Sequence, residues 1–292
     1  MCHWRVLALA TLLTSVLLFG CRGLPRSYLV ELAEARRDAA ELHLLFTKAN
    51  EASNSAVMAD TDELSVRFAR DAEESSKLAE QDLAALRVVL KGLGYPRELR
   101  ALEQLEHNIA EYRKVDRDIL ALAVENTNLK AQRLSFGDGS EAADAVRASL
   151  AAVVSGAAPK DRPKLEAFAT RVVLAVREIQ VLQAPHIAEK DDAAMTRLES
   201  DMRRLGKDAH AALGELGRLV APSVQSDFAA AGAALDRFDR FGVEIVSLSR
   251  RNTNVRSLDL ALRVKPPLTA ACDASLRELT QALADEGGKS TR

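Results

Sequence analysis

The sequence predicts an all-α protein built from two tandem, antiparallel, up-and-down helical bundles. The 292 residues include only 14 Gly and 8 Pro, and aromatic residues make up 4%. Strand-rich folds need more turn residues and more aromatic or β-branched side chains. Between Arg26 and Lys91 there is no Gly and no Pro, and strong helix formers dominate. A repeat at an offset of 126 positions, described below, indicates two copies of one helical unit.

The first 20 residues are predicted to be an export signal. Arg5 precedes an apolar run that ends at Phe19, too short for a comfortable membrane span. The stretch Leu18-Phe19-Gly20-Cys21 resembles the lipobox of bacterial lipoproteins. This resemblance implies cleavage before Cys21 and a lipid on that cysteine. An uncleaved membrane anchor and plain secretion are the alternatives. We expect an exported protein, anchored to the outer or inner membrane and facing the periplasm.

The first predicted module spans residues 21–156. Thr61 or Asp60 caps a second helix after a break, and Gly92, Gly94 and Pro96 separate that helix from a third. The third helix carries an apolar stripe with steps of three and four residues, which is typical of packing against a partner helix. Helices are expected over 27–58, 61–93, from Pro96 to about 136, and 141–155.

The repeat is clearest in the third helix of each half. Residues 119–129 align without gaps on residues 245–255, and five of the eleven positions are identical, including the triplet Asn-Thr-Asn. At the same offset Pro96 meets Pro222. Shared heptads would match apolar seams, but they would not match prolines and a polar triplet. The second module is therefore predicted over 157–286, with helices at 163–188, 190–220, 223–263 and 267–285 and a disordered tail at 287–292.

Asn126 and Asn252 are the first candidate binding residues, because they fall on the apolar seam. Three interpretations stay open: a buried Asn that fixes helix register, a turn in the left-handed conformation that Asn tolerates, or a polar floor for a small ligand between helices. Asn128 and Asn254 lie two residues further on and cannot share that helix face, so they are expected to be surface or capping groups.

A second candidate segment runs from Pro185 to Met195 and holds His186, Asp191 and Asp192. Pro185 is expected to mark a helix end, and either aspartate then caps the next helix. A metal or haem site through His186, or a contact to a small molecule, are the alternatives. No metal site or cofactor is predicted for the chain as a whole.

Charge and motifs exclude several function classes. The chain has 40 basic and 42 acidic residues and a net charge of −2, so it offers no basic surface for nucleic acid. The three cysteines show no disulfide framework and no zinc spacing. Neither a Gly-x-Ser-x-Gly motif nor a phosphate loop occurs, and we predict that the protein is not an enzyme.

The pattern resembles the four-helix-bundle sensor module of bacterial chemoreceptors, the methyl-accepting chemotaxis proteins. An N-terminal apolar segment leads into the first helix, a stretch runs from Ala49-Asn50 to Asp62, and a third helix bearing Asn precedes a loop rich in breakers. The resemblance implies a duplicated, membrane-anchored sensory or ligand-binding protein without its own signalling domain. It would take a small-molecule ligand and act on a protein partner or as a homodimer. A structural or adaptor lipoprotein of the envelope, and a metal- or haem-binding bundle, are the alternatives.

Overall fold

The computed structural model describes residues 28–290, and every regular element in that range is helical. The all-α prediction is confirmed. The predicted signal 1–20 and the lipid anchor Cys21 lie outside the described residues. The elements are α2 Tyr28–Met58, α3 Asp62–Leu93, α4 Pro96–Glu125, α5 Thr127–Phe136, α6 Asp138–Gly156, α7 Arg162–Ala188, α8 Asp192–Gly217, the 3₁₀ turn η1 Pro222–Val224, α9 Gln225–Arg251, α10 Thr253–Asp259, the π-helix η2 Leu260–Val264, and α11 Lys265–Ser290.

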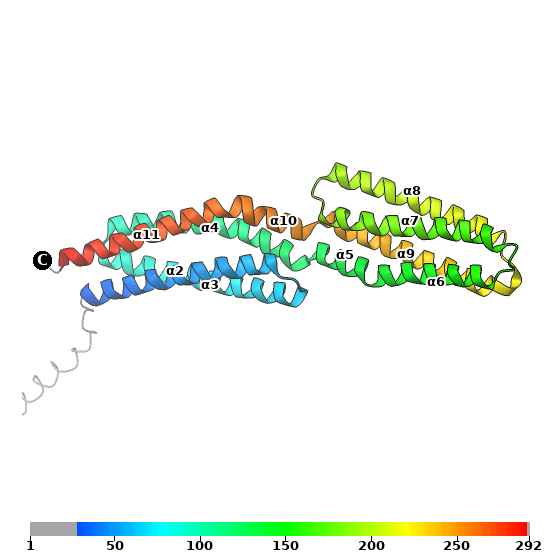
Figure 1. The fold of residues 1–292 in the computed structure, drawn as a ribbon. Coiled ribbons are helices and arrows are strands. Elements are labelled where there is room, and N and C mark those ends of the chain that lie inside the picture. Colours follow the sequence, from blue (N-terminus) through cyan, green and yellow to red (C-terminus); the bar gives the residue numbers. More distant parts are fainter. Residues whose placement is uncertain (1–27, 291–292) are drawn as a thin grey trace, which may run out of the picture.

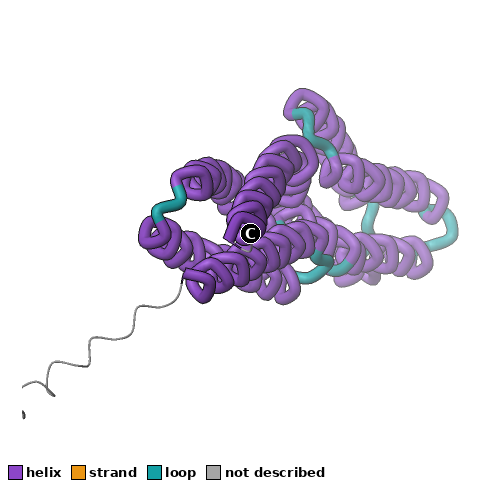
Figure 2. Tube along the Cα trace, turned by 90° about the vertical axis from the view of Figure 1, so that its left-hand side faces the viewer, coloured by secondary structure: helices purple, strands orange, loops and turns teal. Residues whose placement is uncertain are grey.

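The helices form two bundles that lie end to end (Figure 1). The first bundle contains α2, α3, α4 and α11, with α10 packed on α4. The second contains α6, α7, α8 and α9, with α5 packed on α9. The view along the long axis shows helices joined by short loops in both bundles (Figure 2). None of the helices between Tyr28 and Ser290 combines the length and the apolar character that crossing a membrane requires.

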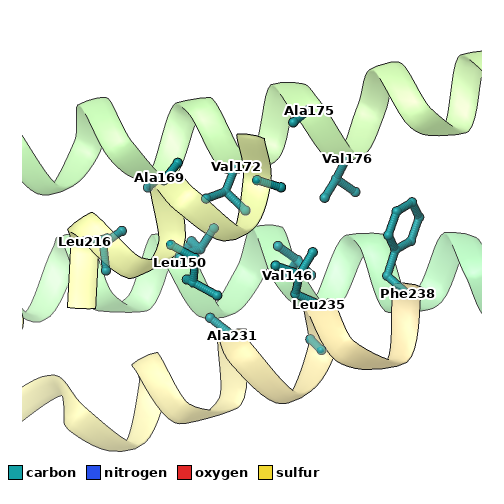
Figure 3. Packing of buried hydrophobic residues seen from close by; sticks show 14 of the residues in the cluster. Val146, Leu150, Ala169, Val172, Ala175, Val176, Leu216, Ala231, Leu235 and Phe238 are labelled. Carbon is teal, nitrogen blue, oxygen red and sulfur yellow. The ribbon is translucent and has the colours of Figure 1, made fainter. Parts of the chain in front are cut away.

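Each bundle closes its own apolar core. The core of the first bundle contains Leu42, Leu86 and Leu102 together with Leu276 of α11, all at most 1% exposed. Figure 3 shows the core of the second bundle, where Val146 and Leu150 of α6 meet side chains of α7 and α9. Burial of a leucine contributes about 1.5–3 kcal/mol, so these two cores hold the bundles together.

The two bundles do not coincide with the predicted modules 21–156 and 157–286. The fourth helix of the first half, α6, packs in the second bundle, and the fourth helix of the second half, α11, packs in the first bundle. Each half has thus exchanged its last helix with the other. That the halves are copies of one ancestral unit stays a prediction.

Local signals explain most helix ends. Thr61 caps α3, where its side chain accepts a hydrogen bond from the Leu64 backbone N–H, and Gly94 ends α3 in the left-handed conformation. Pro185, predicted to mark a helix end, lies inside α7, which continues to Ala188. A proline in the last turn is accommodated there because only one hydrogen bond of the helix is lost. The helix α11 likewise extends past Gly287 and Gly288 to Ser290, because glycine weakens a helix without stopping it.

Candidate functional site

The long helices that run between the bundles break at Asn126 and Asn252. These are the two non-glycine residues with positive φ in the described part of the chain, at 50° and 55°. Both are buried, with exposures of 0% and 4%. Among the three interpretations of these asparagines, the structure therefore shows the left-handed turn. The helices predicted over Pro96–136 and 223–263 do not continue unbroken through the triplets.

The two turns lie against each other and cap each other's helices. The backbone N–H of Thr127 donates to Thr253 Oγ1, and the backbone N–H of Thr253 donates to Thr127 Oγ1. Each N···O distance is 3.1 Å. The N–H of Asn128 and that of Asn254 are likewise bound by the side-chain oxygen of the other asparagine. Neither Asn126 nor Asn252 caps its own helix with its side chain. The first free N–H groups of α5 and α10 are thus satisfied across the pseudo-twofold crossing.

Asn128 and Asn254 were expected to be surface or capping groups. Each does cap a helix, the one in the other half, but the surface part of the expectation is wrong for Asn128. Asn128 is buried at 7% exposure and donates to Asn252 Oδ1, while Asn254 donates to Asn126 Oδ1. The expectation assumed a continuous helix, in which residues two apart face away from each other. The left-handed turn removes that restriction and gathers the whole triplet into one network.

His186 lies beside this crossing and belongs to an ion-pair cluster in the second bundle. Its Nε2 is 3.0 Å from Glu199 Oε1, and the Arg250 guanidinium binds the same oxygen. Burial raises the pKa of Glu199, but hydrogen bonds from Arg250 and His186 outweigh this effect and hold the pKa below its ordinary value. Within the described residues, no three His, Cys, Asp or Glu side chains come together to hold a metal.

The two aspartates of this segment have separate roles. Asp191 is the N-cap of α8 and accepts from the Ala194 N–H at 2.7 Å. Asp192 is exposed and pairs with Arg250 at 3.3 Å. The capping interpretation thus fits Asp191, and both aspartates are exposed.

A cleft that no sequence pattern pointed to lies on the same bundle, between α8 and α9. It has a volume of about 360 Å³ and is walled by apolar side chains, namely Ile179, Met202, Phe238, Val243 and Val246. We call it the α8–α9 cleft. It is open because α8 packs mainly on α7 and makes few contacts with α9. Small-molecule sites in proteins are concave, mostly apolar and upward of about 300 Å³.

Two glycines and one buried amide shape the α8–α9 cleft. Gly206 and Gly242 line it, and a Cβ added at either would meet no atom within 4 Å. Gln183 also lines it and is 1% exposed. The Gln183 Oε1 accepts from Ser135 at 2.6 Å, whereas its Nε2 has no partner. A buried amide group without a partner costs about 1–3 kcal/mol, so this N–H group is suited to donate a hydrogen bond to a bound molecule.

Along the predicted 126-residue offset, residues of the α8–α9 cleft pair with a charged cluster of the first bundle. The positions that match Gly206 and Asp239 are Glu80 and Arg113. Arg113 has a buried guanidinium that binds Glu73 at 2.7 Å and Glu80 at 3.1 Å, and it thereby bridges α4 and α3. The predicted offset thus pairs cleft-lining residues of the second bundle with members of an ion-pair cluster in the first bundle.

The same offset relates a second ion pair to glycines. Asp116 matches Gly242, and Lys265 matches Gly139. In the first bundle Lys265 Nζ lies 3.0 Å from Asp116 Oδ1 and donates to Ser53 Oγ at 2.7 Å, with exposures of 2% and 0% for the charged side chains. Burial lowers the pKa of Lys265, and Asp116 opposes this effect. Alignment of the two halves was the signal that could have found both features.

The comparisons with known proteins agree with the fold. No family model matches the sequence, and no curated protein matches it. Among solved structures, the sensor domain of the histidine kinase sensor TorS from V. parahaemolyticus superposes with a TM-score of 0.51. The match covers 85% of this chain and 99% of that chain, at 13% sequence identity. At this identity the likeness establishes the shared all-helical fold.

Proposed function

We propose that the protein is an extracytoplasmic sensory domain that binds a small molecule in the α8–α9 cleft. The observation that carries the proposal is the cleft itself, a hollow of about 360 Å³ whose lining includes Gln183, a buried residue with an unpartnered Nε2. The likeness to a histidine kinase sensor domain supports the sensory part. The resemblance to chemoreceptor sensor modules supports it independently. The protein has no catalytic role in this proposal.

Because the last helices are exchanged, a molecule bound in the second bundle can change the packing of the first bundle. One wall of the cleft is α9, which passes through Asn252 into α10 and α11. A ligand that shifts α9 against α8 would therefore move α11 among α2 and α4. Packed helix interfaces tend to have discrete arrangements, which is how such shifts become signals. A ligand produces this effect only if it binds one arrangement better than the other.

The membrane tether and the partner are further parts of the proposal. The start of α2 and the end of α11 lie at the same end of the first bundle (Figure 1). Arg36 of α2 accordingly binds the Leu283 backbone oxygen of α11. A lipid on Cys21 would hold this end at the membrane and leave the second bundle, with its cleft, far from it. The chain would then signal through a protein partner or a homodimer at the near end.

A thermal-shift screen of the purified protein against a broad panel of amino acids, organic acids, alcohols and amides at millimolar concentration tests the function. A ligand present at 100 times its Kd stabilises the protein by about 2.7 kcal/mol, which is several degrees in melting temperature. Every stabilising compound is then tested on Gly206→Leu and Gly242→Leu, which fill the cleft. Gly214→Leu and Gly232→Leu are matched controls on the same helices, because they also have free space but lie outside the cleft.

The expected result is binding by wild type and by both controls, and none by the cleft-filling variants. A screen in which no compound stabilises the protein, or in which the cleft-filling variants bind as well as wild type, would contradict the proposal. Cross-linking to a stable envelope protein without any ligand response would instead favour the structural or adaptor function.

A further inference from the structure

The geometry points to a neutral, small amphiphile as the ligand of the α8–α9 cleft: an aromatic or branched aliphatic body with one head group, a hydroxyl or a primary amide, that both donates and accepts a hydrogen bond. This inference rests on the proposed function and specifies its ligand.

The apolar walls define the body of the ligand. Between Met202 and Val246 the cleft presents apolar side chains, with the ring of Phe238 buried at 2% exposure. Gly206 and Gly242 remove the side chains that would close this part. A volume of about 360 Å³ is at the small end for ligand pockets, which favours a single ring or a branched chain over an extended lipid.

The polar groups define the head of the ligand. Gln183 Nε2 is a buried donor without a partner. Glu199 also lines the cleft, and both its hydrogen bonds from His186 and Arg250 go to Oε1. The Arg203 guanidinium lies 3.7 Å from Oε2, too far for a hydrogen bond, so Oε2 keeps accepting capacity. A hydroxyl or primary amide satisfies both groups, because it accepts from the amide and donates to the carboxylate.

Charge argues against an ionised head. The cleft is lined by two carboxylates, those of Glu199 and Asp239, by one guanidinium, that of Arg203, and by the imidazole of His210, whose Nε2 is bound to Asp239 Oδ2. A carboxylate ligand would lie beside Glu199, which its hydrogen bonds keep ionised. An ammonium head can donate to Glu199 but cannot accept from Gln183, and it would leave that amide unpaired.

A matched series of probes on the full-length protein tests the inference by isothermal titration calorimetry. The probes 2-phenylethanol and phenylacetamide have the predicted head, phenylacetate and 2-phenylethylamine carry charge on a similar body, and ethylbenzene has no head. We expect 2-phenylethanol and phenylacetamide to bind roughly five- to tenfold more tightly than phenylacetate and 2-phenylethylamine, which each lack one of the two hydrogen bonds. Ethylbenzene lacks both hydrogen bonds and should bind at least as weakly as the charged probes. Gly206→Leu is expected to abolish binding of 2-phenylethanol and phenylacetamide.

The variant Gln183→Met removes the amide at similar volume. This variant should weaken the binding of 2-phenylethanol roughly five- to tenfold and leave the binding of ethylbenzene unchanged. The control Gln180→Met on the same helix should change the binding of neither compound. Because the probe series needs only wild-type protein, poor folding of Gln183→Met would not prevent the test. Phenylacetate or 2-phenylethylamine binding as tightly as 2-phenylethanol would overturn the inferred head group. Suppose that none of these probes binds, but that another compound from the broad screen binds wild type and does not bind Gly206→Leu. The inferred ligand class is then wrong, and the proposed sensory function stands.

Discussion

Thr127 and Thr253, which are 126 positions apart, each donate a backbone N–H to the side-chain oxygen of the other at 3.1 Å. Each is the first residue of a helix that leads into the opposite bundle. The reciprocal bonds put the two chain crossings on a local pseudo-twofold axis. This explains why a polar triplet, and not only an apolar seam, is shared by the two halves.

Thr127→Val and Thr253→Val should destabilise the protein by similar amounts. Each removes the only side-chain acceptor for a buried N–H at the start of the other helix, which costs about 1–3 kcal/mol. The double variant should cost less than the sum, because the two sites share partners. Urea denaturation followed by circular dichroism measures all three. Unequal single effects, differing by several kcal/mol, would contradict the symmetric network.

Replacement of Asn252 should show the cost of its left-handed backbone. Asn252→Gly and Asn252→Ala both lose the acceptor for Asn128, but alanine also pays about 1 kcal/mol of steric strain at φ 55°. The glycine variant should therefore be the more stable of the two. At Ser247, inside α9 and exposed, the order should reverse by about the same amount, because glycine weakens a regular helix. Equal stabilities at Asn252 would refute the strain argument.

The sequence was sufficient for the helices and insufficient for the way they are shared between bundles. Residue preference located α2 and α3 within one residue, since Thr61 and Gly94 are local signals. The exchange of α6 and α11 is a non-local choice, because both helices carry an apolar face and no local sequence signal says which bundle that face joins. The α8–α9 cleft escaped notice because a cavity is defined by missing side chains, at Gly206 and Gly242. The importance of these glycines becomes visible only when Gly206 is aligned with Glu80 and Gly242 with Asp116 of the other half.

Removal of one member of the buried Lys265–Asp116 ion pair should lower the free energy of unfolding more than replacement of both members by apolar residues. Lys265→Met removes the nearest cation from the buried Asp116 carboxylate and leaves the Arg113 guanidinium 4.0 Å from its other oxygen. We therefore expect a loss of about 3 kcal/mol, the lower end of the range for a broken buried ion pair. The double variant Lys265→Met/Asp116→Leu removes both charges and should recover most of that loss. Chemical denaturation of the singles and the double gives the coupling energy. Besides Asp116, Lys265 Nζ contacts the Ser53 hydroxyl and lies 5.4 Å from the centre of the Tyr112 ring. A double variant as unstable as Lys265→Met would show that these two contacts matter more than the charges.

Acidification should weaken the second bundle through Glu199. Its folded-state pKa lies below that of the unfolded chain, so its contribution is full above the unfolded value and is lost as pH falls through the folded value. Glu199→Gln should cost about 1.5–3 kcal/mol at pH 7, because the Arg250 and His186 bonds lose their charged acceptor. The gap between wild type and variant should narrow as pH falls from 5 to 3. A gap that is constant over this range would show that Glu199 is not linked to folding by its charge.

Cleavage of the α6–α7 loop should leave the two fragments bound to each other. A protease site placed in the loop between Gly156 and Arg162 separates α2–α6 from α7–α11. If residues 21–156 and 157–286 packed as independent bundles, the cut would release two proteins. With exchanged helices, separation would expose the core face of α6, with Val146 and Leu150, and that of α11, with Leu276 and Leu279. Since each such side chain loses about 1.5–3 kcal/mol on exposure, the fragments should elute together from a native size-exclusion column and separate only in denaturant. Wild type without the site, treated with the same protease, controls for cleavage elsewhere, and elution of two separate folded fragments would refute the exchange.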